Sequence, residues 1–446
     1  MAIKLNKIAI AGVACSAIFA GFSAPAFADT SSVIDKLYEL GVLNDEAYAE
    51  LSKEAKDERR EAAEKSAEDS DPNKISCKYS DGFKCKSKDG QFGMQIAGRI
   101  QQDYREYDTT QDSAFDVRRL YLGVKGHVYG DWKYELTQNI DESAGTDNKG
   151  LEYAFVEYAG NPNAHVRIGS QKFHYSFEEI TSSRFTDFAE RSVVNKMVVG
   201  KDRGVNIFGA PIKNQFMYSF GYANGNGRAD DDNNGKLWTA RLAYNATGDK
   251  GKKRGTIAHF DIAYAQGNEP SGNVADVDGE AKSSTKIWTT SGDTASFNKK
   301  LSNVGAVLIS GPWKLQTEYN KYGAEWSATE RTIKTNYAAI SWLITGERYA
   351  DGYSLGGMKA IEPNTVFGSS GGTGAWELGI RRSNVDVSQN MGGSGTNKAD
   401  STTVGLKWIP NHKVRFILNH VHTSYDEAIS SRTSESAWIL RSQLDF

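Results

Sequence analysis

Arginine and lysine side chains recur on one face of short segments in which apolar and polar residues alternate. A strand points successive side chains to opposite faces, so these bases gather on the polar face. Guanidinium groups bind phosphate through two parallel hydrogen bonds, and the lysine ammonium group acts as a point charge. The spacing therefore predicts a polar surface that attracts anions. The recurring bases are Arg99, Arg119, Lys125, Lys133, Arg167, Arg241, Lys314, Arg381, Lys407, Arg415 and Arg441.

Carboxylates share this polar face, which leaves a second interpretation open. Glu135, Asp261, Glu318, Glu377 and Asp445 fall in phase with the bases. A mixed face of this kind also occurs where charged groups only keep a water-filled interior wet. Attraction of anions and ordinary wetting of a lumen are therefore both open from the sequence.

Other kinds of chemistry are weakly indicated. The glycine-rich run at residues 368–372 lacks the Lys and Ser/Thr that follow the glycines of a phosphate-binding loop, so it predicts turns. His420 and His422 are two residues apart, but they fall in phase with Phe416 and Leu418, which favours packing over metal binding. The formal net charge of −3 gives no overall basic field for nucleic acid. We therefore expect no enzyme activity, no metal, no cofactor and no nucleic-acid partner.

The segments that carry the bases fill residues 91–446. Residues 132–140 and 438–446 show the alternation most clearly, and the second of these runs to the end of the sequence. At roughly 20–24 residues for a strand and its connection, such segments are typical of a barrel with lipid outside and water inside. The sequence predicts an all-β fold, a transmembrane antiparallel β-barrel of about 16 strands with a short N-terminal helical arm.

Tryptophans often stand at the ends of the apolar faces. Trp prefers the lipid–water boundary, because part of the side chain is apolar and part can hydrogen-bond. Their position favours a membrane barrel over the alternative, a secreted soluble sandwich. The residues concerned are Trp132, Trp313, Trp376, Trp408 and Trp438.

Two elements without this alternation begin the chain. Residues 1–28 predict a secretory signal, with Lys4 and Lys7 before an apolar stretch and an A-x-A cleavage site that ends at Ala28. Residues 29–72 predict a helical or coiled-coil arm, in which Gly41 ends one helix and Asn44 caps the next. A solvated, partly disordered tether is the alternative for this arm.

Residues 73–90 predict a small basic hairpin or linker. Cys77 and Cys85 are the two cysteines outside the signal, so a disulfide is expected in a secreted chain. The three-residue loop 80–82 ends in Gly82, which suits the left-handed position of such turns. The basic residues of the element are Lys74, Lys78, Lys84, Lys86 and Lys88.

One long irregular stretch, residues 173–202, interrupts the alternating segments. Loops of this length in a compact domain usually have a task. In a barrel this stretch could fold inward, and we expect it to narrow the lumen.

Several of these segments together resemble the phosphate-selective porins, the O and P porin family of Gram-negative outer membranes. The resemblance spans roughly residues 92–446 and is densest at residues 115–126 and 130–134. Further motifs follow in the same order along the chain, at residues 167–173, 178–183, 188–192, 345–348 and 374–378.

The resemblance implies a 16-stranded barrel, a homotrimer, and an anion-conducting channel narrowed by inward loops. It also implies that Arg118, Arg119 and Lys133 contribute to the constriction, with Lys172 as a weaker match. The alternation leaves Arg118 out of phase, so a bulge or strand end is needed for both arginines to reach the pore. Glu152 is a candidate for the carboxylate that lines the pore in that family.

Taken together, the sequence predicts an outer-membrane porin, surrounded by lipid, for passive diffusion of small anions. Phosphate or polyphosphate is the best single solute. A general porin for other small solutes is one alternative, and a structural tether whose arm binds a periplasmic or cell-wall partner is another. The expected anion path comprises Arg118, Arg119, Lys133, Lys172, Arg99, Arg167, Arg241, Arg381 and Arg415.

Overall fold

The computed structural model describes most of the chain after the predicted signal. The described residues are 30–71, 74–80, 82–141, 150–228, 234–270, 274, 276–283, 285–289, 296–326, 329–368, 371–388 and 394–446. Residues 1–28, the predicted signal peptide, lie outside them. The chain divides into two compact units, residues 1–74 and 75–446. Among the described helices, none combines the length and the apolar character needed to cross a membrane.

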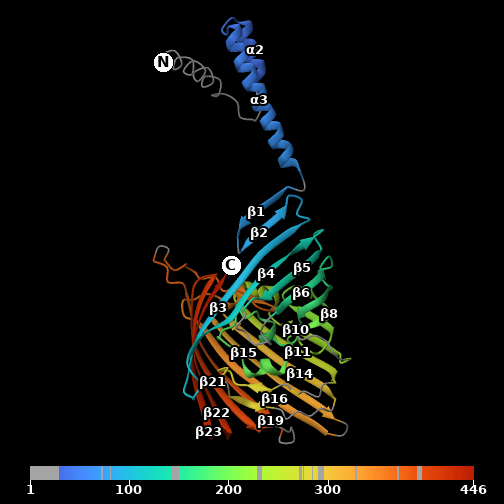
Figure 1. Ribbon diagram of the computed structural model, residues 1–446, viewed down its shortest axis with the longest axis vertical. Coiled ribbons are helices and arrows are strands. Elements are labelled where there is room, and N and C mark those ends of the chain that lie inside the picture. The colour runs from blue at the N-terminus through green and yellow to red at the C-terminus, as the bar shows by residue number, and fades with distance from the viewer. Residues whose placement is uncertain are drawn as a thin grey trace. The chain divides into compact units, whose positions relative to one another are not determined.

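The first unit is a pair of helices, α2 (Thr30–Glu39) and α3 (Asp45–Ser70) (Figure 1). Gly41 has a positive φ of 69° where α2 ends, and the Asn44 side chain accepts a hydrogen bond of 2.9 Å from the backbone N–H of Ala47. Ile34 and Ala55 are buried between the helices. The predicted helical arm is therefore present, and the helix end and the cap lie where the sequence placed them.

The second unit begins with a hairpin of β1 (Ile75–Tyr79) and β2 (Phe83–Ser87). Tyr79 pairs with Phe83 and Cys77 with Cys85, so the strands have the register expected for a three-residue loop. A disulfide joins the two cysteines, with an S–S distance of 2.04 Å. Strand β2 also pairs with the start of β3, which attaches the hairpin to the main sheet.

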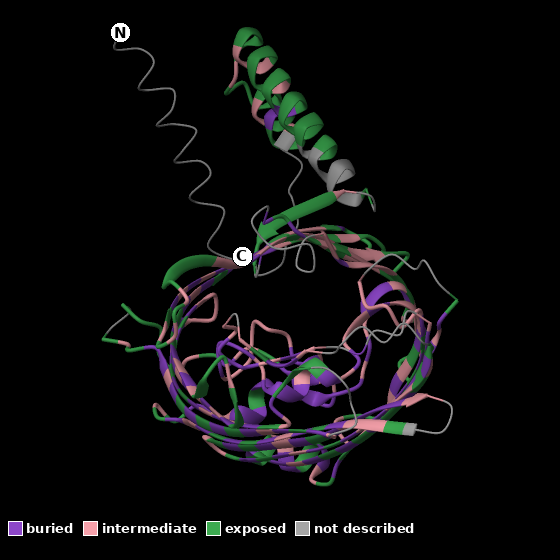
Figure 2. Cartoon of the chain, turned by 60° about the horizontal axis from the view of Figure 1, so that its bottom comes forward, coloured by how far each residue is buried: buried purple, intermediate pink, exposed green. Residues whose placement is uncertain are grey.

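The main sheet is a closed antiparallel barrel (Figures 1 and 2). It closes where the last strand pairs with the first, for example Leu440 with Tyr104. Closure leaves no open sheet edge to face lipid. Within the described residues it has sixteen strands, as predicted: β3 (Gly93–Tyr107), β4 (Ala114–Val128), β5 (Trp132–Asn139), β6 (Gly150–Tyr158), β7 (His165–Lys172), β8 (Lys201–Ile212), β9 (Phe216–Ala223), β10 (Leu237–Asn245), β11 (Thr256–Glu269), β14 (Phe297–Ser310), β15 (Trp313–Trp326), β16 (Thr329–Leu343), β19 (Ala375–Val387), β21 (Lys398–Asn411), β22 (Val414–Ile429) and β23 (Arg432–Asp445).

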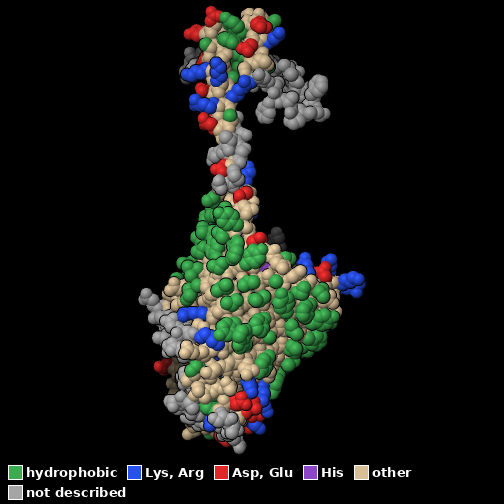
Figure 3. All heavy atoms as spheres, turned by 90° about the vertical axis from the view of Figure 1, so that its right-hand side faces the viewer, with side chains coloured by type: hydrophobic (Ala, Val, Ile, Leu, Met, Phe, Trp, Pro, Cys, Tyr) green, Lys and Arg blue, Asp and Glu red, His purple; other side chains and the backbone are tan. Residues whose placement is uncertain are grey.

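The alternation in the sequence separates the two faces of this barrel. Leu136 and Ile168 point outward and are 55% and 57% exposed. The guanidinium-bearing side chains of Arg241, Arg381 and Arg441 are instead fully buried inside. On the face shown in Figure 3, hydrophobic side chains cover a broad belt of the barrel. The outer face therefore suits hydrocarbon, and the polar groups are kept inside.

The described parts of three long connections fold into the ring (Figure 2). The β7–β8 segment, residues 173–200, contains α4 (Phe177–Ile180) and η1 (Val193–Met197). The β11–β14 segment, residues 270–296, contains β12 (Val277–Asp278) and β13 (Lys286–Thr289), and β13 pairs with β20 (Ser394–Gly395). The β16–β19 segment, residues 344–374, contains η2 (Tyr349–Gly352), β17 (Tyr353–Ser354) and β18 (Gly357–Met358). A short helix, α5 (Gly248–Arg254), joins β10 to β11.

The β7–β8 segment folds inward, as the sequence predicted, and it contacts the barrel wall at β22. The backbone N–H of Ala189 donates to the Asn419 side chain of β22 at 2.7 Å, and Thr181 accepts a hydrogen bond from Met358 in the β16–β19 segment at 3.0 Å. Phe188 lies over Gly379 and Gly405, where a Cβ atom would come within 3.0 Å of the ring. The inward fold thus depends on space that two wall glycines leave free.

Replacing Cys77 and Cys85 by Ser should loosen the hairpin and leave the barrel folded. An isolated two-stranded hairpin is marginal in water, and closing so short a loop by a disulfide is worth about 2–3 kcal/mol. The measurement is trypsin cleavage after Lys78 and Lys84, with heat-modifiable gel mobility reporting the barrel. We expect faster cleavage and unchanged mobility, and equal cleavage rates would show that the β2–β3 pairing alone holds the hairpin.

Candidate anion path

The Arg118–Arg119 pair lies at an irregularity in β4. Gln101 pairs with Arg119 and Gln102 with Val117, so Arg118 is the additional residue of a bulge. Both side chains can then turn inward. Arg118 binds the Glu190 carboxylate at 2.7 and 3.1 Å, and Arg119 donates to the Gln101 side chain at 2.8 Å.

Glu190 of the β7–β8 segment is a shared acceptor for three arginines. Its carboxylate lies 2.7 Å from Arg105, 2.7 Å from Arg118 and 2.8 Å from Arg441. Asp103 adds a second carboxylate, 2.6 Å from both Arg105 and Arg441. Burial alone would raise the pKa of Glu190, but the three guanidinium groups hold that pKa well below its usual range. Glu190 is therefore an anionic clamp between the inward segment and the wall.

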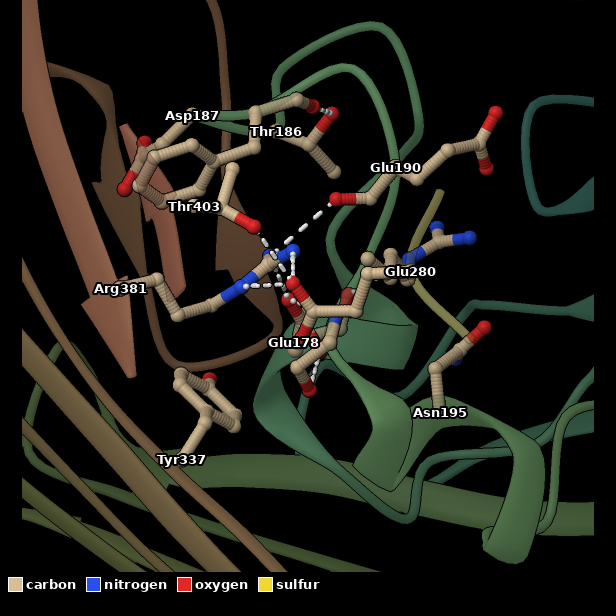
Figure 4. A network of polar contacts seen from close by, with 12 residues as sticks. Glu178, Thr186, Asp187, Glu190, Asn195, Glu280, Tyr337, Arg381 and Thr403 are labelled. Carbon is tan, nitrogen blue, oxygen red and sulfur yellow. Dashed lines mark hydrogen bonds and ion pairs between the residues drawn. The ribbon is translucent and has the colours of Figure 1, made fainter. Parts of the chain in front are cut away.

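Arg381 of β19 forms a second clamp (Figure 4). Its guanidinium lies 2.6 Å from Glu280 of the β11–β14 segment and 3.4 Å from Glu178 of the β7–β8 segment. It also donates to the backbone carbonyl of Glu190 at 3.1 Å, and Thr403 donates to Glu280 at 2.7 Å. Arg381 thus joins two inward segments to the wall.

Other recurring bases of the polar face are paired in the same way. Arg241 binds Asp261 on the neighbouring strand through two guanidinium nitrogens, the longer contact being 3.0 Å. Lys314 lies 2.6 Å from Asp187, and Lys407 lies 2.7 Å from Glu377. These bases are matched by carboxylates inside the barrel. On β10, β15, β19 and β21, the recurring bases therefore form ion pairs that stabilise the interior of the barrel.

A subset of the bases along β3–β7 has a different setting. This subset lines a cavity of about 350 Å³, here called the inner cavity, between these strands and the β7–β8 segment. Its lining contains one carboxylate, Glu135. Two tyrosines and two phenylalanines complete much of the wall. The basic residues of the lining are Arg99, Lys125, Arg167, Lys172 and Arg184.

Asp445, the penultimate residue, forms ion pairs with three arginines near this cavity. Its carboxylate lies 3.7 Å from Arg99, 3.2 Å from Arg184 and 2.9 Å from Arg415. The Arg99 guanidinium also donates to the Ser183 hydroxyl at 2.5 Å. One carboxylate faces three guanidinium groups, so the cluster keeps an excess of positive charge.

The remaining bases of the cavity wall differ in how firmly they are held. Arg167 binds Glu157 at 2.5 Å and stacks over the Phe155 ring at 4.2 Å. Lys172 lies 3.1 Å from the Glu179 carboxylate. Lys125 is exposed, and among the described residues it has no ion pair. The path thus combines one solvent-exposed ammonium group without an ion pair among the described residues with several paired cations.

A second cavity of about 630 Å³, here called the mouth cavity, adjoins the first. The two share Lys125, Glu135, Phe155 and Arg167 in their linings. Lys133, which lies 3.7 Å from Glu157, also lines the mouth cavity. A row of basic groups therefore continues from one cavity into the next.

The structure divides the nine residues expected on the anion path. Arg99, Arg167 and Lys172 line the inner cavity, and Lys133 lines the mouth cavity. The other five residues line neither of these two cavities. They make the ion-pair and hydrogen-bond contacts described above. The five are Arg118, Arg119, Arg241, Arg381 and Arg415.

Sequence reasoning also missed functional side chains. Arg184 lies within a stretch that was expected to fold inward, but no local pattern indicated that its charge would face the cavity. Glu190 likewise has no sequence signal for its three partners. Glu152, the candidate pore carboxylate, is buried and paired with Lys201 and Arg228. His420 is on the outer face against Trp438, with ring centroids 4.7 Å apart.

Replacing Glu190 by Gln should weaken the docking of the β7–β8 segment. Removing one partner of a buried charged cluster typically costs about 3–5 kcal/mol. We expect faster trypsin cleavage after Arg184 and Arg191 in the folded protein. The matched control is Glu325→Gln, whose pair with Lys300 is more than a third exposed and so contributes little to stability. Equal cleavage of the two variants would contradict the clamp.

The same clamp has a defined pH dependence. The folded-state pKa of Glu190 lies below the unfolded value of about 4.3. Its contribution to stability is therefore fully present above that value and is lost as the pH falls through the depressed pKa. Protection from acid-stable proteases should persist at pH 5 and decline only in strong acid. A loss of protection between pH 7 and pH 5 would contradict this assignment.

The barrel part of this chain is similar to known proteins. The family model described as phosphate-selective porin O and P matches residues 94–446. Porin O of Pseudomonas aeruginosa is 24% identical over 402 residues, which cover 79% of this chain and 88% of that protein.

Two solved structures are similar in fold. The anion-selective porin from Comamonas acidovorans has a TM-score of 0.51 at 13% identity, covering 80% of this chain and all of that one. OmpT of Vibrio cholerae in its trimer form has a TM-score of 0.50 at 10% identity, covering 80% of this chain and 99% of that one. The family match spans the barrel from the second residue of β3 to the final residue, and the chain belongs to the phosphate-selective porin O and P family of outer-membrane proteins.

Proposed function

We propose that this porin is a passive diffusion channel for small anions, and that phosphate-like anions are its preferred solutes. The observation that carries the proposal is the row of bases along β3–β7. Five basic side chains and one carboxylate line the inner cavity. Charged rings and ladders of this kind determine which ions enter a pore.

The contacts of these bases favour weak binding of the solute. Arg99, Arg167 and Lys172 each already have a carboxylate within 4 Å. An entering anion would compete with that internal partner and would not find an empty, fully positive site. Conduction requires binding strong enough for entry and weak enough for release. Several weak stations in series satisfy both conditions.

The aromatic side chains of the cavity add to this setting. Arg167 stacks on Phe155, and Arg99 lies over the Tyr121 ring at 4.9 Å. Stacking holds a guanidinium plane in a fixed orientation without neutralising its charge. Flat, oriented guanidinium groups suit the oxygens of phosphate better than they suit a spherical chloride ion.

Relatives support the anion preference only by analogy. The family description refers to phosphate, and the structural relative from Comamonas acidovorans is described as anion-selective. We also propose the finer features that the family resemblance implies, namely a homotrimer and removal of the signal near Ala28. The trimer form of OmpT supports the first of these.

The N-terminal arm has a separate proposed role. Val33, Leu40, Val42 and Leu51 are exposed apolar side chains on this small unit. We propose that these side chains are covered in the cell, either by the arms of a trimeric coiled coil or by a periplasmic or cell-wall partner. A structural tether remains compatible with conduction through the barrel.

Neutralising Lys125 and Arg184 together should lower the anion preference of the channel. Both line the inner cavity, and Asp445 would still retain Arg99 and Arg415 as partners, so the fold should persist. The measurement is the zero-current potential of the purified protein in a planar bilayer under a KCl gradient. We expect the anion-to-cation permeability ratio to fall roughly fivefold, as for a loss of about 1 kcal/mol of charge interaction.

The control removes the same formal charge from the outer face, as Lys321→Gln with Arg382→Gln. It should leave the potential unchanged, because these side chains do not line the cavities. Phosphate is then titrated into the chloride solution. Block of the chloride current supports phosphate as a solute. Weak or cation preference in the unmodified protein would overturn the proposal in favour of a general porin.

A second pair of substitutions tests the constriction expected from the family. Arg119→Gln with Lys133→Gln should also reduce the anion preference if these residues lie at the narrowest point. Unchanged zero-current potentials would reject that assignment, while the path through Lys125 and Arg184 would still stand.

A further inference from the structure

One histidine ring lies among the cations of the inner cavity. The β7–β8 segment begins with three aromatic residues whose side chains are completely buried, Phe173, Tyr175 and Phe177. His174 lies between the first two, is half-buried and lines the inner cavity. Because both of its neighbours belong to one apolar cluster, the backbone at His174 has little freedom. The ring is therefore held at a fixed place in the cavity wall.

The His174 ring packs against Phe208 of β8. The two ring centroids are 4.6 Å apart. Arg167, the cavity base on β7, lies over the same phenylalanine ring at 5.0 Å. Phe208 is thus a common support for a guanidinium plane and an imidazole plane. Both groups line the inner cavity, so one solute there can contact both.

Asn206 of β8 determines which nitrogen of His174 carries the proton. Its amide nitrogen Nδ2 lies 3.0 Å from Nδ1 of His174, and its amide oxygen accepts a hydrogen bond of 2.8 Å from the Ser219 hydroxyl. An amide nitrogen can only donate, so Nδ1 is the acceptor, and a proton on Nδ1 would face the amide N–H. The neutral ring therefore carries its proton on Nε2. Among the described residues none accepts a hydrogen bond from Nε2, which leaves this N–H for a solute in the cavity.

The surroundings of His174 also oppose a positive charge on the ring. Arg167 of β7 and Arg241 of β10 are cations, and the Glu157 carboxylate of β6 pairs with Arg167 and His165. Burial, together with Arg167, Arg241 and His165, holds the pKa of His174 well below its usual range. His174 thus adds a hydrogen-bond donor to the cavity without adding charge. The other charged groups that line the cavity are Arg99, Lys125, Glu135, Lys172 and Arg184.

We propose that His174 determines the specificity of the inner cavity, as a neutral hydrogen-bond donor that favours oxyanions such as phosphate over chloride. An oxyanion has several oxygens, so one can accept from Nε2 while another meets the guanidinium of Arg167. Chloride is a single sphere and gains from both groups only where they converge on one point. A neutral donor adds a directional contact without strengthening the field that attracts every anion. The use of this donor in transport rests on the proposed anion channel.

The first test compares His174→Phe with His174→Gln in a planar bilayer. Phenylalanine keeps an aromatic ring against Phe208 and removes the donor, whereas the glutamine amide keeps an N–H at a similar reach. The measurement is the phosphate concentration that halves the chloride current. We expect this concentration to rise roughly tenfold in His174→Phe, as for one lost hydrogen bond to an anion, and less than roughly threefold in His174→Gln. Heat-modifiable gel mobility reports that each barrel is folded.

The zero-current potential under a KCl gradient separates a donor from a cation. His174→Phe removes no charge, so the potential should equal that of the unmodified protein. A fall in anion preference would show that the ring acts as a cation and would overturn the proposal. An unchanged half-blocking concentration in the folded variant would also overturn it. His174→Leu, which lacks a donor as well, gives the same comparison without a second ring against Phe208.

The role of Asn206 as a positioning residue has a separate pH test. In Asn206→Asp a carboxylate faces Nδ1 and favours the protonated ring, so the pKa of His174 should rise. The pair then carries one negative charge above that raised pKa and none below it. The anion preference of this variant should therefore be lower than that of the unmodified protein at about pH 8 and should recover as the pH falls to about 5. Absence of that recovery would overturn the role of Asn206.

A second comparison tests whether His174 stays neutral. The unmodified protein and His174→Gln should show the same dependence of the zero-current potential on pH between about pH 8 and about pH 5. A difference between them would show that His174 titrates in this range, and it would overturn the neutral donor.

Binding can also be measured without conduction, from the phosphorus NMR line width of inorganic phosphate mixed with the full-length protein in a detergent that contains no phosphate. Exchange with a bound state should broaden the line for the unmodified protein and His174→Gln, and at least roughly threefold less for His174→Phe. Broadening that depends on His174, together with absent anion selectivity in the bilayer, would retain the donor and reject the proposed channel function. Equal block by phosphate in all variants would retain the channel and reject the donor. Absence of both block and broadening in the unmodified protein would overturn both.

Discussion

The charge of the lumen depends on how the acidic side chains of the β7–β8 segment pair with the barrel wall. A buried carboxylate needs a cationic partner and further hydrogen bonds, or it becomes strongly destabilising. Three of the segment's four carboxylates find such partners away from the inner cavity. Each of these three carboxylates also removes at least one wall cation from the set that a passing ion can meet. Glu178 pairs with Arg381, Asp187 with Lys314, and Glu190 with Arg118, Arg105 and Arg441.

This distribution explains why bases that recur evenly along the sequence give an uneven distribution of positive charge in the lumen. Bases on β10, β15, β19 and β21 meet carboxylates of the inward segments or neighbouring strands. Arg99, Lys125, Arg167 and Lys172, on β3, β4 and β7, instead line the inner cavity, where Glu135 is the lining carboxylate. The segment that narrows the lumen also sets its polarity, because it neutralises one part of the wall and brings Arg184 to the other. Narrowing and charge selection thus have one structural cause.

Local patterns were sufficient to predict the barrel, the helix cap at Asn44 and the register of the hairpin, because each depends on spacings of a few residues. The bulge at Arg118 could also be predicted from the sequence, since two adjacent arginines cannot both face inward on a regular strand. The pairing of Arg441 with Glu190 could not be predicted, because 251 residues separate them and no local signal links them. For the same reason the inward fold of the β16–β19 segment was missed. Whether a base lines the path or holds a segment is decided by such distant partners.

The Asp445 cluster shows how such a partner can hold cations without cancelling them. Phe446 exchanges backbone hydrogen bonds with Gly98 at 2.8 and 3.2 Å, and its ring lies where a Cβ of Gly98 would be. That contact fixes the last strand and places Asp445 opposite Arg99. Three guanidinium groups without any carboxylate would repel one another in a partly dry site, and a second carboxylate would cancel most of their charge. A single carboxylate keeps them in place and leaves positive charge in excess. An anion can therefore enter as an additional, exchangeable partner, and the same carboxylate favours its release.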